Sequence, residues 1–460
     1  MIPLIGKWII LPVEIKVREL DSRLWLSFAA LQRSYGVVIG SMRQVERYQD
    51  NLPAGIYVTK DISPGKWQQL QYLNDRRHAV VCQDEETTIA SGSYDLFFDQ
   101  RVSEQSLKMV RYFYTWGAGD TESLIRAYPW AETRVTLTGS PRVDLWRSEL
   151  RGFYSDAVKR IKRKYGDYVL ICSNFGSNNI SSDEKVLLTA VKMGSLRDEK
   201  AICRAKNQLA YKRRLFDDFR TVPEILSKAF PEERIIVRPH PIEDPTIWQN
   251  AISSVPNARV AFEGAITPWL LGAKAIVHNS CTSAVEASVL ERPVIAYRPI
   301  MSAEFDFEVA NSLSLETENP AELIAGVRAV LTDPERFLST QSIRASQLLQ
   351  RHLGALDGDL AAERILDCFE NINWSGLPPS QPKLNGWLQS ASDEFHDRLG
   401  GLKRRLQGKG PKRHFHKFPG LGQRELNEKL QRFAALRGNH RPFRTRRLSK
   451  DLFAIWTQET

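Results

Sequence analysis

Short β-rich runs alternate with stretches of helical periodicity along most of this chain, and this alternation restricts the folds open to it. The first run, Trp8–Val13, is apolar throughout, as a strand buried on both faces would be. Strands separated by helices form parallel sheets with crossover connections. The other runs that we predict as strands are Gly36–Gly40, Gly55–Thr59, Ala79–Gln83, Tyr112–Trp116, Arg134–Thr138, Asp167–Ser173, Arg234–Arg238, Ala258–Phe262, Ala275–Asn279 and Pro293–Tyr297. The sequence therefore predicts an α/β fold.

The predicted strands form two series, separated by a charged stretch at Ser148–Gly166. A chain of 460 residues exceeds one ordinary compact core, so each series is expected to build its own domain. We predict a Rossmann-like domain at 1–150 and a second at 151–372, closed by helices within Ala321–Leu331 and Ile343–His352. Residues 373–460 are predicted to be a basic appendage of helix and loop. No GxGxxG follows the first strand, so dinucleotide binding has no direct support.

The net charge of +10 is concentrated at the end of the chain. Residues 381–460 carry 18 Lys and Arg against 7 Asp and Glu, whereas the rest of the chain is nearly neutral. Such a basic segment suits anionic lipid headgroups or nucleic acid, and a solvated helical surface is the alternative.

The five cysteines lie far apart and include no CxxC pair, which favours a reducing compartment and argues against a zinc site. The apolar runs are too short to cross a bilayer, and Trp8–Val13 is predicted to be a buried strand rather than part of a signal peptide. We therefore expect a cytoplasmic location.

Polar side chains follow the predicted strands, at the edge where parallel sheets bind ligands. The first strand is followed by Glu14, Arg18 and Glu19, and Ala79–Gln83 by Asp84, Glu85 and Glu86. Carboxylates crowded at the end of a buried strand have raised pKa values, which suits a general base or nucleophile. The alternative for the acidic triplet is a solvated turn. Arg142, in a Gly-Ser-Pro turn, is predicted either to pair with a carboxylate across the cleft or to pair with Asp144.

The second series has its own polar strand ends. They comprise Asn174, the pair Arg238 and His240, and a group formed by Asn279, Ser280, Thr282, Ser283 and Glu286. Hydroxyls and backbone N–H groups at a helix start bind phosphate, although capping of the helix by Ser280 or Thr282 is the simpler alternative. His240 lies between two prolines, so its backbone is restrained, and with Arg238 it can clamp a phosphate. The alternative for His240 is a hydrogen bond to the backbone.

These clusters resemble bacterial surface polysaccharide biosynthesis proteins over residues 7–370. The segments that carry the resemblance are ILPVEIKVRELDSRLWL, VVCQDEETT, YFYTWGAGDTESL, TLTGSPRVDLW, IVRPHPIED and VHNSCTSAVEASVLERPVIAYRP. The histidine–proline pair and the Ser/Thr-rich helix start also look like the motifs of GT-B enzymes that use CMP-activated acidic sugars, namely Kdo transferases and bacterial sialyltransferases. In these proteins the acidic motif is often followed by Gly, whereas Thr87 and Thr88 follow here.

The resemblance implies two Rossmann-like domains facing across a cleft, with no metal or cofactor required. It places the donor nucleotide on the second domain, with His240 at a phosphate or carboxylate and Ser280 and Thr282 at the phosphate. Glu286 would reach the ribose. The acidic loop would hold the catalytic carboxylate, with Glu85 as first choice and Asp84 or Glu86 as alternatives.

The expected function is therefore metal-independent transfer of Kdo or another acidic keto-sugar from a CMP donor to a lipid-linked or oligosaccharide acceptor. Arg18 and Arg238 would hold the sugar carboxylate, and Glu14, Glu19 and Arg142 would line the acceptor side. The basic tail would hold the enzyme at the anionic inner face of the inner membrane, and no nucleic-acid partner is expected. The alternatives are a UDP-N-acetylglucosamine 2-epimerase-like enzyme, a CDP-polyol phosphotransferase, and a non-catalytic module that binds nucleic acid or membrane.

Overall fold

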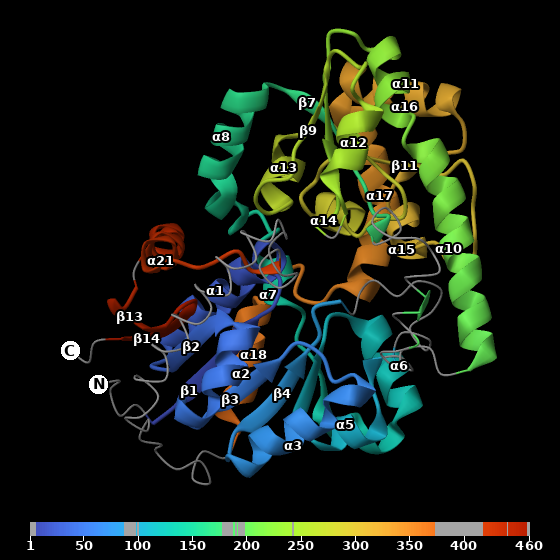
Figure 1. Cartoon of the computed structure of the whole chain (residues 1–460). Coiled ribbons are helices and arrows are strands. Elements are labelled where there is room, and N and C mark those ends of the chain that lie inside the picture. The colour runs from blue at the N-terminus through green and yellow to red at the C-terminus, as the bar shows by residue number, and fades with distance from the viewer. Residues whose placement is uncertain are drawn as a thin grey trace, which may run out of the picture. The chain divides into compact units, whose positions relative to one another are not determined.

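A computed structural model describes residues 6–86, 98, 101–176, 187–188, 191, 198–241, 243–372, 417–438 and 440–457 of the protein. The chain divides into two compact units (Figure 1). In the described residues, the first unit contains the chain up to Phe153 and again from Gln350 onward, and the second contains Tyr154–Leu349. Each unit has its own Rossmann-like sheet, which confirms the predicted α/β class with two Rossmann-like domains.

The sheet of the first unit has the order β13-β14-β2-β1-β3-β4-β5-β6. Its strands are β1 (Trp8–Val13), β2 (Gly36–Ser41), β3 (Ile56–Thr59), β4 (Ala79–Gln83), β5 (Tyr112–Thr115), β6 (Val135–Leu137), β13 (Phe443–Ser449) and β14 (Leu452–Thr457). The strands from β1 to β6 are parallel, whereas β14 pairs antiparallel with β2 and with β13. The order of the strands reverses between β1 and β3.

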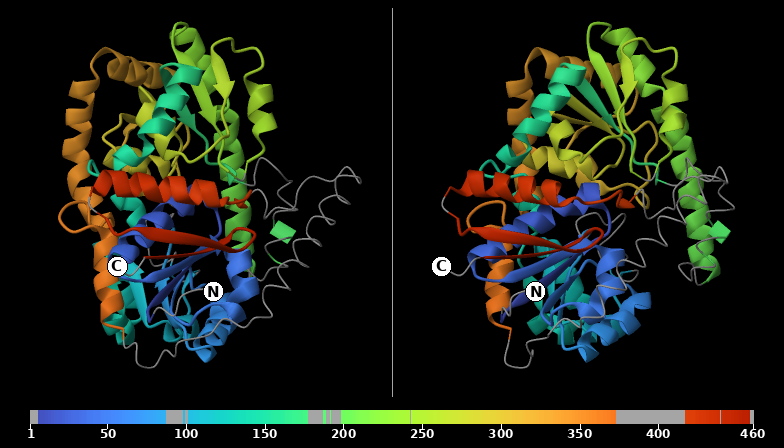
Figure 2. Two further views of the ribbon diagram at one scale, coloured as in Figure 1. Left: turned by 90° about the vertical axis from the view of Figure 1, so that its left-hand side faces the viewer. Right: turned by 60° about the vertical axis from the view of Figure 1, so that its left-hand side comes forward.

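Helices of the first unit connect these strands and pack on the sheet (Figure 2). They are α1 (Lys16–Gln32), α2 (Met42–Tyr48), α3 (Trp67–Asp75), α5 (Glu104–Lys108), α6 (Ala118–Ala127), α7 (Pro141–Asp144), α18 (Ala361–Glu370) and α21 (Gln423–Arg437), with short 3-10 turns at Gln49–Asn51, Pro64–Lys66, Pro129–Arg134 and Arg151–Tyr154. Helix α1 follows β1 directly and buries most of its residues, because it also contacts α7, α18 and α21.

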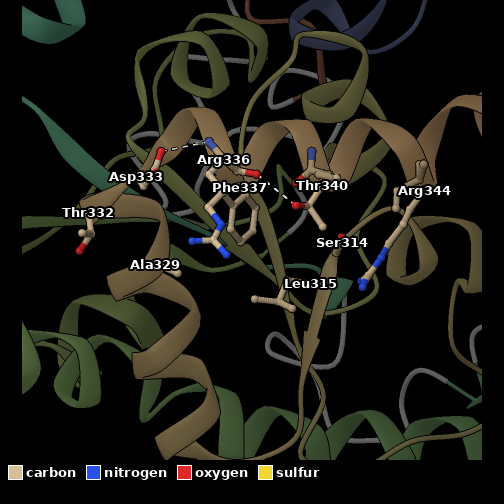
Figure 3. Close-up of a pocket in the computed structure, with 11 residues that line it drawn as sticks. Ser314, Leu315, Ala329, Thr332, Asp333, Arg336, Phe337, Thr340 and Arg344 are labelled. Carbon is tan, nitrogen blue, oxygen red and sulfur yellow. Dashed lines mark hydrogen bonds between the residues drawn. The ribbon is translucent and has the colours of Figure 1, made fainter.

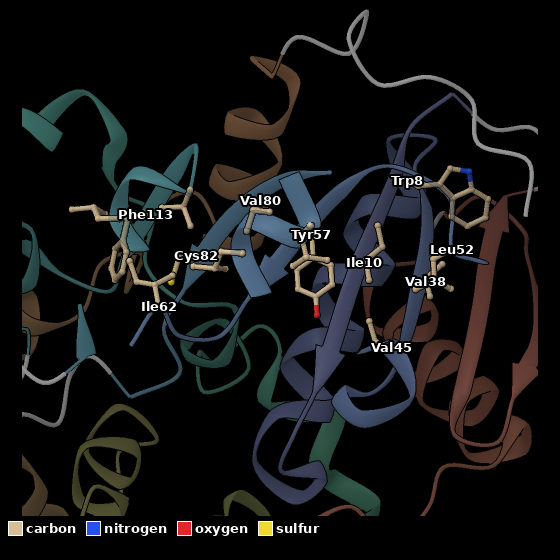
Figure 4. Packing of buried hydrophobic residues seen from close by; sticks show 14 of the residues in the cluster. Trp8, Ile10, Val38, Val45, Leu52, Tyr57, Ile62, Val80, Cys82 and Phe113 are labelled. Atoms are coloured by element: carbon tan, nitrogen blue, oxygen red, sulfur yellow. The ribbon is translucent and has the colours of Figure 1, made fainter. Parts of the chain in front are cut away.

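A continuous apolar core explains why the central strands read as unbroken hydrophobic runs. Every residue of β1, β2, β3 and β4 is buried. Figure 4 shows Ile10, Val38, Tyr57, Val80 and Phe113 in one buried cluster that crosses the sheet from strand to strand. A parallel strand covered on both faces has no exposed position for a polar side chain, so its sequence does not alternate.

The sheet of the second unit has the order β12-β11-β10-β7-β8-β9 and is parallel throughout. Its strands are β7 (Tyr168–Cys172), β8 (Arg234–Arg238), β9 (Ala258–Val260), β10 (Ala275–His278), β11 (Val294–Tyr297) and β12 (Leu315–Thr317). Its helices are α8 (Ser155–Tyr165), α10 (Glu199–Phe219), α11 (Val222–Ala229), α12 (Pro245–Ala251), α13 (Thr267–Gly272), α14 (Ser283–Val289), α15 (Glu308–Ser312), α16 (Pro320–Thr332) and α17 (Pro334–His352), the last of which leads the chain back to the first unit. This is the 3-2-1-4-5-6 strand order of nucleotide-binding Rossmann folds, with its reversal between β7 and β10.

The end of the chain corrects the expectation of an appended tail. Strand β14 pairs with β2, so β13 and β14 extend the first sheet, and the ring of Phe433 on α21 packs 5.4 Å from Trp25. Gly40 permits the pairing, because a Cβ there would collide with the carbonyl oxygen of Asp451. The segment 373–416 of the predicted appendage lies outside the described residues.

Candidate functional site

The first polar group lies where the strand order of the first sheet reverses. Glu14 follows β1, and Lys60 follows β3, the strand on the other side of the reversal. The Glu14 carboxylate accepts hydrogen bonds from Lys60 and from Lys417. Burial raises the pKa of Glu14, but the two ammonium groups outweigh burial and lower it to about 2. Glu14 is therefore a fixed anion at this edge of the sheet.

Arg18 and Glu19, at the start of α1, are brought to the same edge. The backbone N–H of Glu14 donates to Glu19 Oε2 at 2.7 Å, and Arg18 Nη2 lies 3.4 Å from Glu19 Oε1. Arg18 Nη2 also donates to Glu86 Oε1 at 2.9 Å, which ties the first helix to the acidic triplet. Burial and the nearby charge of Glu85 raise the pKa of Glu19. The predicted grouping of these polar strand ends is thus present.

The acidic triplet after β4 is held by arginines, so it is not a simple solvated turn. Arg101 donates to both oxygens of Asp84 at 2.9 Å, and its Nη1 lies 3.4 Å from Glu86 Oε2. Burial raises the pKa of Asp84 to about 6 despite the opposing effect of Arg101. Burial also acts to raise the pKa of Glu86, but Arg18 and Arg101 reverse the shift and lower it. The upward shift expected from crowding is therefore found at Asp84 and not at Glu86.

Glu85 forms a buried ion pair with Arg23, a residue that the sequence analysis missed. Arg23 Nη2 lies 3.1 Å from Glu85 Oε1, and the two side chains are 2% and 6% exposed. The second oxygen, Oε2 of Glu85, has no hydrogen-bond partner among the described residues. Arg23 follows Glu19 by one helical turn, and this i, i+4 spacing was the available signal.

Asp120 is a second carboxylate that was not predicted from the sequence, although it lies within the segment YFYTWGAGDTESL. It is buried at the start of α6, and its Oδ2 accepts the Trp116 N–H at 3.0 Å. Trp116 Nε1 donates to the backbone oxygen of Asp84 at 2.6 Å. Burial raises the pKa of Asp120 to about 7, and its Oδ1 has no hydrogen-bond partner among the described residues. A carboxyl of this kind can exchange a proton near neutral pH.

Arg142 does not pair with Asp144. The Asp144 carboxylate accepts from Trp25 Nε1 at 2.9 Å and from the backbone N–H groups of Ala361 and Ala362, at the start of α18. Arg142 instead lies over the ring of Trp146, 5.7 Å from its centroid. The pairing offered as an alternative is therefore corrected, because Asp144 is buried and fully occupied by α18 and α1.

In the second unit, the predicted residues after β7 and β10 meet where the strand order reverses. Asn174 Nδ2 donates to the backbone oxygen of Ser280 at 3.0 Å, and Ser280 Oγ accepts from Asn311 Nδ2 at 2.8 Å. Ser280 has a φ of 44°, in the left-handed region, where strain is typical of functional loops. The Oδ1 of Asn279 is buried without a hydrogen-bond partner among the described residues. An acceptor of this kind suits a hydroxyl or amino group of a ligand.

His278, at the end of β10, holds this loop. Its Nδ1 accepts the Cys281 N–H at 3.2 Å, so the proton is on Nε2, which lies 2.8 Å from Ser314 Oγ. Burial lowers the pKa of His278 to about 3, so the ring is neutral. Ser283 Oγ donates to Cys281 Sγ, and Thr282 makes no side-chain cap on α14. Capping of α14 by Thr282, the simpler alternative, is therefore not found.

His240 is half-buried at the end of β8, and the turn after it is fixed by Glu243. The Glu243 N–H donates to the backbone oxygen of His240 at 2.8 Å. Its buried carboxylate accepts from Ser173 Oγ at 2.7 and 2.8 Å, from Phe175 N–H at 2.8 Å and from Trp248 Nε1 at 2.9 Å. Burial raises the pKa of Glu243 although these donors oppose the shift. Glu243 thus joins the His240 turn to the end of β7.

Two of the predicted donor residues have structural partners instead. The buried guanidinium of Arg238 donates to the backbone oxygens of Glu263 and Gly264 and lies 5.2 Å from the Trp269 ring centroid. Glu286 accepts a hydrogen bond from Thr267, which links α14 to α13. The roles expected for Arg238 at an anion and for Glu286 at a ribose are revised, because both groups are buried and bound to neighbouring elements.

No group of three or more His, Cys, Asp and Glu side chains is placed to hold a metal ion within the described residues. In the same part of the chain, no helix combines the length and apolar character needed to cross a membrane.

No protein-family model matches the chain, and no curated protein matches it in sequence. Among solved structures, a variant of the wall teichoic acid polymerase TagF is 12% identical, with a TM-score of 0.52 over 79% of this chain and 88% of that chain. TagF soaked with CDPG is 13% identical, with a TM-score of 0.50 over the same shares. The Methanocaldococcus jannaschii UDP-GlcNAc 2-epimerase is 14% identical, with a TM-score of 0.47 over 79% of this chain and 99% of that chain. The similarity to TagF extends to both units, and the fold of the chain is GT-B-like.

Proposed function

We propose that the protein is a transferase of surface-polysaccharide synthesis that takes its donor from an activated nucleotide. The observation that carries the proposal is the polar group at the strand reversal of the second unit. Asn174, Asn279 and Ser280 meet there, and the buried Oδ1 of Asn279 lacks a partner among the described residues. Nucleotides bind at this point of a 3-2-1-4-5-6 sheet, and His240 ends the neighbouring strand β8.

The acceptor is assigned to the first unit, where Glu85 is proposed as the catalytic base or nucleophile. Its Oε2 is not engaged by another described residue, whereas both oxygens of Asp84 are held by Arg101. Arg18 remains the proposed ligand of an acidic group. The proposed donor is CMP-linked Kdo or another acidic keto-sugar, and the proposed acceptor is lipid-linked or an oligosaccharide. Catalysis is proposed to need no metal.

A polyol phosphotransferase that uses a CDP-linked alcohol is the second candidate, since TagF shares the fold and has been soaked with CDPG. Both candidates require a cytidine nucleotide, whereas an epimerase requires a UDP-sugar.

Nucleotide binding tests the proposal directly. Calorimetry with CMP, CDP, UDP and GDP, without and then with magnesium, should show metal-independent binding that is tightest for CMP. Tighter binding of CDP would favour the polyol candidate, and tighter binding of UDP would favour the epimerase. Asn279→Ala should weaken binding by about tenfold without loss of thermal stability, because Oδ1 has no partner in the described protein to lose. No binding by any nucleotide would refute the proposal.

We also propose that the basic end of the chain associates with the membrane, and point substitutions test this better than truncation. Removing the residues after Asn373 would also remove β14 and α21, which are parts of the first unit. The arginines at positions 437, 444 and 446 are exposed and can be changed to Gln while β14 and α21 are kept. Arg437 also lies over the ring of Trp25, so the melting temperature of the triple variant is measured alongside its binding. The triple variant should bind vesicles rich in anionic lipid at least tenfold less tightly, at about 1 kcal/mol per charge. Equal binding by both proteins would refute the role, and Lys228→Gln in the second unit is the control.

A further inference from the structure

A pocket in the second unit lies away from the residues assigned to the donor. It has a volume of about 410 Å³ and is lined by the edge strand β12 with the residues before it, the end of α16 and the first turns of α17. The residues of the donor group follow the carboxyl ends of β7, β8 and β10. The pocket instead meets β12 at its first residue, Leu315, which is the opposite end of the strand. The volume is within the range of sites that hold small molecules.

The wall formed by α17 is basic. Arg336 and Arg344 are two i, i+4 steps apart on this helix, so they share a face and their backbones are about 12 Å apart. Figure 3 shows both side chains beside the pocket, with Phe337 and Leu315 also facing it. Neither guanidinium has a hydrogen bond or ion pair with another described residue. Asp333, the acidic residue of the lining, accepts from the Arg336 backbone N–H as a helix cap.

Phe337 and Leu315 give the pocket an apolar surface between the two charged groups. An aromatic ring and an aliphatic side chain bind the apolar body of a ligand, and guanidinium groups bind carboxylate, sulfonate or phosphate. The two kinds of side chain together select a ligand that is anionic at one end and apolar at the other.

The pocket is also connected to the loop that follows β10. Ser314 borders the pocket and lies directly before β12. Its Oγ donates to the Ala310 backbone oxygen at 2.8 Å and lies 2.8 Å from His278 Nε2, the protonated ring nitrogen. The other ring nitrogen accepts the Cys281 N–H. One neutral imidazole therefore connects Ser314 to the loop of Asn279 and Ser280.

We propose that this pocket binds a small anionic molecule with an apolar body, and that its occupation is sensed by the loop at 279–282. The site is distinct from the donor site and does not depend on the identity of the donor. A ligand that lies against β12 and α17 reaches the loop through Ser314 and His278.

Anilinonaphthalene sulfonate, a fluorescent anion with an aromatic body, is the probe for binding. We expect saturable binding to the full-length protein that weakens at least tenfold in Arg336→Ala and in Arg344→Ala. Ala329→Trp, which places a bulky side chain in the pocket wall without removing a charge, should abolish binding. All three residues are exposed on helices, so the melting temperature should stay unchanged. Lys228→Ala, an exposed cation elsewhere in the unit, is the control, and unaltered binding in all three variants would overturn the site.

Hydrogen exchange tests the connection. Saturating probe should change exchange at least twofold in a peptide that covers residues 279–283. Ser314→Ala should still bind the probe, since its hydroxyl is used by His278 and Ala310, but should lose the change in exchange. Probe binding without any effect on this peptide would overturn the connection, and none of these outcomes depends on the proposed transferase function.

Discussion

The buried pair of Arg23 and Glu85 determines what a substitution of the proposed catalytic base will measure. Both side chains are almost wholly removed from solvent, and one oxygen–nitrogen pair at 3.1 Å joins them. The three guanidinium nitrogens of Arg23 make no hydrogen bond of good geometry within the described protein. The charge of Glu85 therefore provides most of the energy that offsets the removal of the Arg23 guanidinium from water.

Glu85→Gln removes that charge and leaves the arginine buried without a counter-ion. Breaking a buried pair in this way costs about 3 to 5 kcal/mol, whereas replacing both partners by apolar residues of similar volume is often close to neutral. We expect Glu85→Gln to lower the free energy of unfolding of the first unit by about that amount. The double variant Arg23→Met, Glu85→Leu should recover most of it.

Urea unfolding followed by tryptophan fluorescence measures the loss, since Trp25 lies in the same helix as Arg23. Glu104→Gln is the matched control, because its partner Lys108 is 54% exposed and such pairs contribute less than about 1 kcal/mol. A loss below 1 kcal/mol for Glu85→Gln, or a double variant less stable than the single one, would refute the reasoning. If Glu85 is the base, the double variant will be folded and still inactive, which separates catalysis from stability.

Three further predictions concern other parts of the two units. Burial raises the pKa of Asp120 to about 7, so protonation of this carboxyl contributes about 4 kcal/mol to the free energy of unfolding; the contribution is complete below pH 4 and is lost as the pH rises through 7. Urea unfolding at pH 5, 6 and 7 should therefore show a smaller decrease in stability for Asp120→Asn than for the native protein. Equal slopes with pH for the two proteins would contradict this prediction. Glu243→Gln replaces a carboxylate that accepts from three donor groups by an amide with N–H groups of its own. The free energy of unfolding of the second unit should fall by about 2 to 4 kcal/mol, and nucleotide affinity should fall as the His240 turn loosens. A denaturation midpoint equal to that of the native protein would argue against this prediction. Gly40→Ala should force β14 away from β2, cost about 1 to 3 kcal/mol and speed amide exchange in β14, whereas Gly65→Ala, which has open space, should have no such effect.

The polar strand ends were predictable as a group, but their pairing was not. Glu14, Glu19 and Asp84 follow or flank buried strands, and the carboxyl ends of parallel strands meet at one edge whatever the details of the fold. The partners Arg23 and Arg101 belong to elements with no strand-end signal. Their proximity depends on how α1 and the segment before α5 pack over the sheet, which no local pattern encodes.

Arg238 illustrates the opposite error. A guanidinium beside a histidine at a strand end is typical of an anion site, but in the structure the side chain is buried and donates to two backbone oxygens. An arginine has five donors, and whether a ligand or a neighbouring loop accepts them depends on which acceptors the fold brings within reach. The sequence shows the donors alone.

By itself, the sequence determined the central strands of both sheets, their division into two series and the alternation of strand and helix. A run such as Trp8–Val13 must be buried on both faces because apolar surface is removed from water wherever the chain allows it. Only the tertiary structure decided that β13 and β14, more than 400 residues later, complete the first sheet. Their outer face carries arginines at 444 and 446 and resembles a solvated segment, and pairing with β2 depends on an open sheet edge and on the absence of a side chain at Gly40. These are properties of the assembled sheet and not of the strands that join it.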